Sequence, residues 1–176
     1  MSRWTIASVY VSIACLAVTA CSGSMGERFR PLSPGDPVPV YSVVTLSGDS
    51  VHVGPDRQEP LTLMNVWATW CIPCRKEFPD LQRIHTDYSS RGLRVVAVSI
   101  DSPGDVDKIR EFASRYSATF TIAHDHGAVV RDRYRSIGIP ETYLISPDGK
   151  LLFRNPGAFP EGAANLRAEI EKALAR

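Results

Sequence analysis

Cys71 and Cys74 are separated by two residues and directly follow an apolar run at residues 61–67. This run has the length and side-chain branching of a buried strand, and the next segment has the apolar spacing of a helix. A thiolate at a helix N-terminus is stabilised by unpaired backbone N–H groups and by the helix dipole, so its pKa falls. We therefore expect Cys71 to attack disulfides and Cys74, one turn later, to resolve the mixed disulfide.

The alternative interpretation of this cysteine pair is that it supplies two of the four ligands of a zinc site. Tetrahedral zinc needs four ligands, and the other cysteines, Cys15 and Cys21, lie near the N-terminus. His124 and His126 could complete a set, but no second ligand pair has a finger-like spacing. We therefore expect a redox pair with no resident metal and no cofactor.

The elements that must position the pair are predicted by hydrophobic periodicity. Residues 71–90 carry apolar side chains along one helical face, and residues 93–100 are typical of a parallel strand covered on both sides. With the strand at residues 61–67 they predict a βαβ unit. We expect further helices at residues 106–116, at residues 128–135 and from near Pro160, and a short strand at residues 119–122.

Two hairpins complete the predicted domain. Residues 40–46 and 50–53 flank a Ser-Gly-Asp turn, and residues 143–145 and 150–153 flank Ser-Pro-Asp-Gly. These elements predict one α/β domain over residues 40–176 with an N-terminal β-hairpin. The chain has 176 residues and a formal net charge of +1, which gives no reason to expect a nucleic acid partner.

The N-terminal segment predicts export. Residues 1–20 combine a positive Arg3, an apolar stretch and short side chains at the end, as secretory signal peptides do. Residues 18–21, Val-Thr-Ala-Cys, resemble the lipobox of bacterial lipoproteins, which implies that Cys21 is lipidated and becomes the first mature residue. Ordinary secretion is the alternative. Residues 21–39 are rich in Gly and Pro and predict a flexible tether, so the domain would face the periplasm or the cell exterior.

Four motifs, at residues 67–79, 95–101, 138–140 and 145–149, together resemble the TlpA/ResA-like branch of extracytoplasmic thioredoxins. The likeness runs from about residue 37 to the C-terminus. It implies a thioredoxin-like three-layer fold with a central mixed sheet. It also implies a membrane-tethered thiol-disulfide oxidoreductase that reduces exported proteins such as apocytochrome c. In the leading interpretation, a transmembrane thiol electron donor reduces the pair again.

The resemblance also assigns residues around the substrate. Pro140 would be a cis-proline, whereas the sequence alone leaves the isomer open because about 5–6% of X-Pro bonds in folded proteins are cis. The Ile139-Pro140 peptide would then offer backbone groups to an extended substrate. Trp70, directly before the nucleophile, would lie on the partner-facing surface, with simple packing as an equal alternative.

Glu77 matches a family glutamate that tunes the cysteine pair, and a carboxylate near a buried thiol could take its proton. The alternative is an exposed helix glutamate that pairs with a neighbouring basic residue. Thioredoxin itself has a buried acid where this chain has Asn65. Many relatives have Thr after the cis-proline, so we expect Glu141 to add a negative charge at the site that disfavours acidic partner segments.

A copper-binding redoxin or metallochaperone module is the runner-up function. Related redoxins bind copper through two cysteines and a histidine, but they have a longer cysteine spacing and a histidine in the late loop, where this chain has Ile139-Pro140-Glu141. His124 and His126 are more simply a polar entry to the short helix. A peroxidase is not supported, because the Pro-X-X-X-Thr-X-X-Cys motif is absent.

Overall fold

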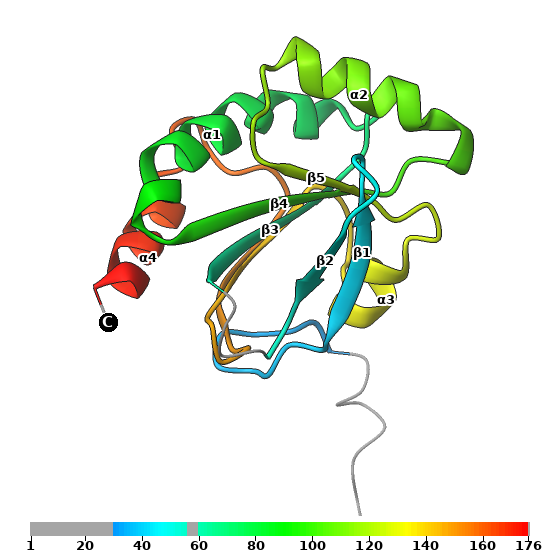
Figure 1. Cartoon of the computed structure of the whole chain (residues 1–176). Coiled ribbons are helices and arrows are strands. Elements are labelled where there is room, and N and C mark those ends of the chain that lie inside the picture. The colour runs from blue at the N-terminus through cyan, green and yellow to red at the C-terminus, as the bar shows by residue number, and fades with distance from the viewer. Residues whose placement is uncertain (1–29, 56–59, 176) are drawn as a thin grey trace, which may run out of the picture.

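The computed structural model describes residues 30–55 and 60–175 (Figure 1). The predicted signal peptide at residues 1–20, the predicted lipidation at Cys21 and the first part of the tether lie outside the described residues. No helix in the described ranges is long and apolar enough to cross a membrane.

A seven-stranded sheet forms the centre of the domain, in the order β2-β1-β5-β4-β3-β6-β7. The strands are β1 (Tyr41–Thr45), β2 (Ser50–Val53), β3 (Leu61–Trp67), β4 (Leu93–Ser99), β5 (Thr121–His124), β6 (Glu141–Ile145) and β7 (Leu151–Pro156). β3 pairs in parallel with β4, and β4 with β5, while the other pairs are antiparallel. The predicted mixed sheet and N-terminal hairpin are thus confirmed.

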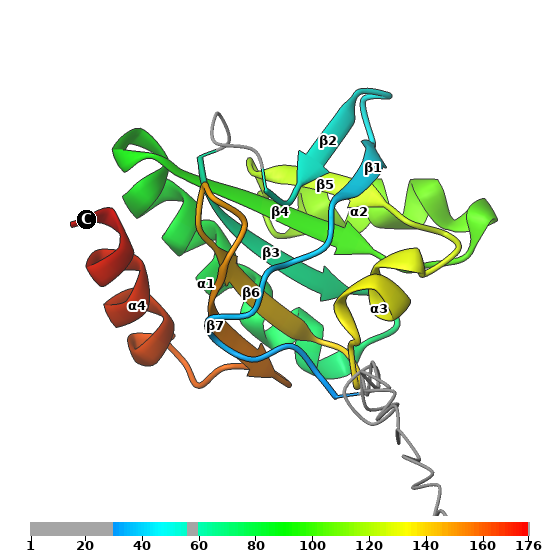
Figure 2. The ribbon, with the colours of Figure 1, turned by 90° about the horizontal axis from the view of Figure 1, so that it is seen from below.

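Helices cover both faces of this sheet (Figures 1 and 2). The helices are α1 (Ile72–Tyr88), α2 (Val106–Arg115), α3 (Val129–Tyr134) and α4 (Ala164–Leu174). Apolar side chains of α1, α2 and α4 share one core with one face of the sheet. Side chains of α3 and of the β1–β2 hairpin share a second core with the opposite face. Because β3 and β4 contribute to both cores, their sequences read as continuous apolar runs.

Several element boundaries differ from the sequence-based prediction. β6 begins at Glu141, two residues earlier than expected, and β7 ends at Pro156, three residues later than expected. β5 begins at Thr121 and ends at His124, two residues later than expected. α4 begins at Ala164 rather than near Pro160. Gly162 and Ala163 have φ angles of +79° and +50°, and this left-handed backbone cannot belong to a right-handed helix.

Part of the predicted tether packs on the domain. Val38 N donates to Gly149 O at 2.9 Å and Gly35 N donates to Leu151 O at 2.8 Å, so residues 30–39 lie along the β6–β7 hairpin. Leu32 and Val38 are buried in the second core. The prediction of a flexible tether is therefore wrong for residues 30–39, because two apolar side chains in that segment are buried in the core.

Candidate active site

The loops that carry the predicted site residues leave the same end of adjacent strands. Trp67, the last residue of β3, is aligned with Ser99 in β4, and its neighbour Val66 is aligned with Glu141 in β6. β3 and β4 run in parallel, whereas β6 runs the other way. The loop after β3, the loop after β4 and the loop before β6 therefore meet at one edge of the sheet.

Cys71 and Cys74 form a disulfide at this edge, with an S–S distance of 2.06 Å. Cys71 is the N-cap of α1, and its Sγ accepts the N–H of Cys74 at 3.3 Å. Cys71 is 4% exposed and Cys74 is completely buried. The sulfur that the sequence predicted as the nucleophile thus lies at the positive end of a 17-residue helix, where a thiolate is favoured.

Asp101, a residue for which no role was predicted, holds the loop that leads to the cysteines. Its buried carboxylate accepts the N–H of Thr69 at 2.9 Å and the hydroxyl of Thr69 at 2.6 Å. Ser99 Oγ donates to the same carboxylate at 2.7 Å. The signal that could have revealed this role is an acid placed directly after a buried parallel strand, at the edge where the site must form.

Glu77 is buried on the inner side of α1, with only 2% of its surface exposed. Its Oε1 accepts a hydrogen bond from Asn65 Nδ2 at 2.8 Å, and its Oε2 accepts one from Phe159 N at 3.4 Å. The alternative of an exposed helix glutamate is therefore wrong. The pKa of Glu77 is raised from 4.5 to about 7, mainly by burial and to a smaller extent by the nearby Asp80, although the two hydrogen bonds lower it.

The Ile139-Pro140 peptide bond is cis, as predicted. Pro140 is buried, and its carbonyl oxygen accepts Gly157 N at 2.8 Å. Three large apolar residues near this edge are exposed: Trp70 at 61%, Ile72 at 68% and Ile137 at 64%. The packing alternative for Trp70 does not hold, since most of its side chain is at the surface. An apolar rim beside a sulfur is suited to a polypeptide partner.

The structure overturns the expectation for Glu141. Its side chain is fully buried rather than presented to a partner. The guanidinium of Arg154, in β7, forms an ion pair with it, with Arg154 Nε 2.6 Å from Oε1. Its Oε2 accepts Ile137 N at 3.1 Å. The sequence could not indicate this, because Arg154 lies 13 residues away on the neighbouring strand.

The histidines considered for a metal lie apart from the cysteines in the chain. The rings of His124 and His126 are 5.9 Å apart, and His124 Nε2 lies 2.9 Å from the carbonyl oxygen of Asp101. Within residues 30–55 and 60–175, no group of three or more His, Cys, Asp or Glu residues is placed to hold a metal ion. No observation therefore favours the copper-binding alternative.

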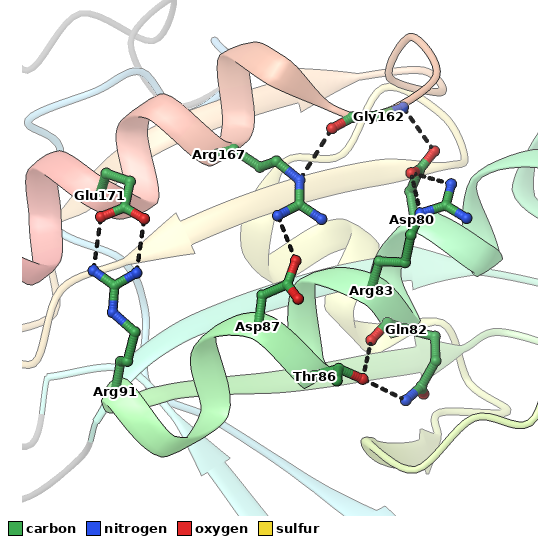
Figure 3. Close-up of polar contacts among 9 residues, drawn as sticks. All are labelled: Asp80, Gln82, Arg83, Thr86, Asp87, Arg91, Gly162, Arg167 and Glu171. Atoms are coloured by element: carbon green, nitrogen blue, oxygen red, sulfur yellow. Dashed lines mark hydrogen bonds and ion pairs between the residues drawn. The ribbon is translucent and has the colours of Figure 1, made fainter.

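Polar contacts fix α4 and the preceding loop against the catalytic helix (Figure 3). Asp80 on α1 accepts Gly162 N at 3.2 Å, and Arg167 Nε on α4 donates to Gly162 O at 3.1 Å. Arg167 also reaches Asp87 on α1 at 2.7 Å. These contacts hold the loop whose backbone also binds Glu77.

Comparisons with known proteins agree with this geometry. The AhpC/TSA family matches residues 34–154. The thiol-disulfide oxidoreductase ResA of Oceanobacillus iheyensis is 30% identical over 148 residues, which are 82% of this chain and 76% of that protein. The thioredoxin-like protein YneN of Bacillus subtilis is 35% identical over 119 residues, 67% of this chain and 68% of that protein.

A solved structure extends the likeness to the fold. A Chlorobium tepidum protein described as the thiol:disulfide interchange protein DsbE has a TM-score of 0.73 and 30% identity, covering 81% of this chain and 99% of that one. The predicted thioredoxin-like fold is thus confirmed, and with it the predicted redox enzyme. The chain is a thiol-disulfide oxidoreductase of the ResA and DsbE type and belongs to the AhpC/TSA family.

Proposed function

We propose that the protein is a membrane-anchored reductase of disulfides in exported proteins, such as apocytochrome c. The observation that carries the proposal is the placement of the two sulfurs: Cys71 caps the N-terminus of α1 and keeps 4% of its surface exposed, while Cys74, one turn later, is completely buried. An attacking sulfur needs access and thiolate character, and a resolving sulfur needs only to reach its neighbour.

The reaction starts from the reduced pair. The Cys71 thiolate attacks one sulfur of the target disulfide, a mixed disulfide forms, and the second target sulfur leaves as a thiolate. The Cys74 thiolate then attacks Cys71 Sγ, the mixed disulfide breaks, and the other target sulfur leaves. Two electrons have passed to the target, and the enzyme is left with the disulfide that the structure contains. A transmembrane thiol donor returns two electrons to this disulfide.

Glu77 supplies the proton transfer that the second step needs. Cys74 and Glu77 are three residues apart, so they lie on one side of α1, and both are buried. A carboxylate with a pKa of about 7 is near the value at which a general base is most effective at neutral pH. It takes the Cys74 proton as that sulfur attacks, with Asn65 holding the carboxylate in place.

The substrate lies against the loop before β6. The backbone of Ile139 pairs with an extended segment of the partner, and the exposed side chain of Trp70 packs against that segment. Hydrogen bonds to backbone groups depend little on the side chains of the partner. This arrangement suits an enzyme that acts on several exported proteins.

The proposed location rests on the N-terminal sequence. Lipidation of Cys21 after removal of residues 1–20 would anchor the protein at a bacterial membrane through two or more acyl chains, which is what stable anchoring requires. In cells grown with labelled palmitate, the full chain should carry label and Cys21→Ala should not. Label that persists in Cys21→Ala would refute the anchor without touching the redox chemistry.

Trapping tests the reductase directly. The full chain should reduce insulin, Cys71→Ser should be inactive, and Cys74→Ser should accumulate mixed disulfides through Cys71. Mass spectrometry of the partners trapped by Cys74→Ser in cells should identify exported proteins with paired cysteines, among them apocytochrome c. An exclusively cytoplasmic set of partners, or trapping that persists in Cys71→Ser/Cys74→Ser, would contradict the proposal.

A further inference from the structure

A groove of about 190 Å³ lies between α2 and the segment that carries the cysteine pair, with Thr69 before the pair and Arg75 after it in the lining. Thr69, two residues before Cys71, lines one part of it, and Phe112 and Tyr116 contribute aromatic surface. Arg75, one turn into α1, also lines it. The groove is therefore continuous with the loop that presents the nucleophile.

Basic side chains predominate in the lining of this groove. Arg75, Lys108 and Arg115 contribute three positive charges, against one negative charge from Glu111. Lys108 and Arg115 are 70% and 66% exposed. Their positive groups are therefore accessible to a bound molecule.

The existing ion pairs of these residues leave them able to bind another carboxylate. Lys108 pairs with Asp105 at 2.5 Å and Arg115 with Glu111 at 2.8 Å, both at the surface, where such pairs add little to stability. Arg75 donates from Nε and Nη2 to the carbonyl oxygen of Thr69. In the described ranges it forms an ion pair with no carboxylate.

The acidic side chains at this edge of the sheet do not oppose the positive charge of the groove at the surface. Glu77 is 2% exposed, and Asp101 and Glu141 are fully buried. Glu141 is in addition paired with Arg154. Glu111, which lines the groove and is 71% exposed, pairs with Arg115, and Asp105 pairs with Lys108. The three basic side chains therefore exceed these two acids by one positive charge, and Arg75 is the basic group without a carboxylate partner among the described residues.

We propose that the groove selects partners by binding acidic side chains close to the target disulfide. The inference rests on the reductase function proposed above and adds a preference to it. Thr69 lies two residues from Cys71, a span of at most about 7 Å in an extended chain. Arg75 binds the carbonyl oxygen of Thr69 and lines the groove together with Lys108. Aspartate or glutamate within a few residues of the target cysteine would therefore meet this positive charge while the sulfurs react.

Three synthetic peptides test the preference. Each has one internal disulfide, and they differ only in whether Asp, Asn or Lys occupies the flanking positions. The reduced full chain is mixed with each peptide, and its oxidation is followed by alkylation and mass spectrometry. The Asp peptide should react at least about three times faster than the Lys peptide at low salt. The ratio should fall towards one at about 1 M salt, where the Debye length is about 3 Å.

Two charge reversals on the same helix locate the effect. Lys108→Glu should lower the ratio of the Asp to the Lys rate constant, whereas Arg110→Glu, whose native side chain binds Leu46 O at 3.2 Å and does not line the groove, should preserve it. Circular dichroism checks that both variants fold, and Lys108→Gln replaces Lys108→Glu if it does not.

Each result decides between the two proposals. Equal rate constants for the Asp and Lys peptides, with the Asn peptide reduced, would overturn the groove and leave the reductase intact. An equal loss of the preference for the Asp peptide in Lys108→Glu and Arg110→Glu would also overturn the groove proposal, because the charge of the whole surface would then be responsible for the preference. Failure of the wild type to reduce any of the three peptides would overturn the reductase and the groove together.

Discussion

Asn65 Nδ2 lies 2.8 Å from Glu77 Oε1 and joins the centre of the sheet to the inner side of the catalytic helix. The same amide donates to Thr142 Oγ1 at 2.9 Å, so it bridges α1 and β6 through β3. All three side chains are buried. A hydrogen bond from an uncharged amide leaves most of the desolvation of the carboxylate uncompensated, which is why the pKa of Glu77 stays high.

We predict that Glu77 makes the oxidised protein less stable as the pH rises. Its pKa is raised from 4.5 to about 7 on folding, so the folded state binds the proton more tightly than the unfolded state does. The stabilisation is complete below pH 4.5 and is lost as the pH passes 7. At about 1.4 kcal/mol per pH unit, the loss is about 3 kcal/mol.

Urea unfolding of Glu77→Gln at pH 4.5, 6 and 8 measures this loss. The difference in the free energy of unfolding, variant minus wild type, should rise by about 3 kcal/mol from the lowest to the highest pH, because only the wild type loses the contribution of Glu77. Glu111→Gln, at an exposed position on α2, should track wild type within about 0.5 kcal/mol. Parallel curves for wild type and Glu77→Gln would show that Glu77 has an ordinary pKa.

We predict a second effect of Glu77→Gln on the rate. If Glu77 takes the Cys74 proton, the release of a trapped partner should depend on an ionisation near pH 7 in wild type and lose that dependence in the variant. The variant should be slower by about 100-fold at neutral pH. Stopped-flow measurement of the resolution step checks this, and an unchanged pH profile for that step would exclude Glu77 as the base.

Asp101 should be needed to hold the loop before Cys71. In Asp101→Ala, the N–H and hydroxyl of Thr69 and the hydroxyl of Ser99 lose their acceptor, at a cost of about 1–3 kcal/mol for each buried donor left unpaired. The free energy of unfolding and the rate of alkylation at reduced Cys71 should both change. Asp107→Ala, at a 97% exposed position, is the control and should change neither.

Hydrophobic periodicity and turn residues were sufficient to predict the βαβ unit and the two hairpins. The apolar runs of β3 and β4 and the helical spacing of α1 predicted the βαβ unit, and this unit alone brings Cys71 and Cys74 to the edge of the sheet. The hairpins followed from glycine-containing turns. The cis isomer at Pro140 came from the family resemblance, since no local signal distinguishes it.

The polar contacts of the site depend on residues that are distant in the chain. Glu77 binds Phe159 N, 82 residues later, and Thr69 binds Asp101, 32 residues later. Glu141 looked like a surface charge because no cation lies beside it in the sequence, but β6 is covered on both edges by β3 and β7. Strand order and register bring Arg154 to it, and neither can be read from periodicity.

Gly149 should not tolerate a side chain. Its φ is +76°, and an added Cβ would lie 2.5 Å from both Cα and Cβ of Pro55. Gly48 has a φ of +96° with nothing within 4 Å of such a Cβ, so it is a matched control for the backbone strain alone. Gly48→Ala should lose about 1–2 kcal/mol, and Gly149→Ala should lose about 1–3 kcal/mol more through the clash. Equal losses by urea unfolding would rule out the close approach to Pro55.

The buried pair of Glu141 and Arg154 gives the last prediction. Arg154→Leu leaves the Glu141 carboxylate buried without its cation, and such losses are about 3–5 kcal/mol. Replacing both residues, in Glu141→Leu/Arg154→Leu, removes the unpaired charge together with its partner, so the double variant should lose less than the two single variants summed. The exposed pair of Arg91 and Glu171 is the control, and its double-mutant cycle should show little coupling.

A second measurement connects this pair to substrate binding. Glu141 Oε2 holds Ile137 N at 3.1 Å, and residues 137–140 form the loop that presents the cis peptide bond. A neutral Glu141→Gln keeps an acceptor for Ile137, whereas Glu141→Leu does not. KM for a disulfide peptide should therefore rise in Glu141→Leu and be restored, at least in part, in Glu141→Gln. The same KM in both variants would mean that the pair stabilises the sheet without ordering the loop.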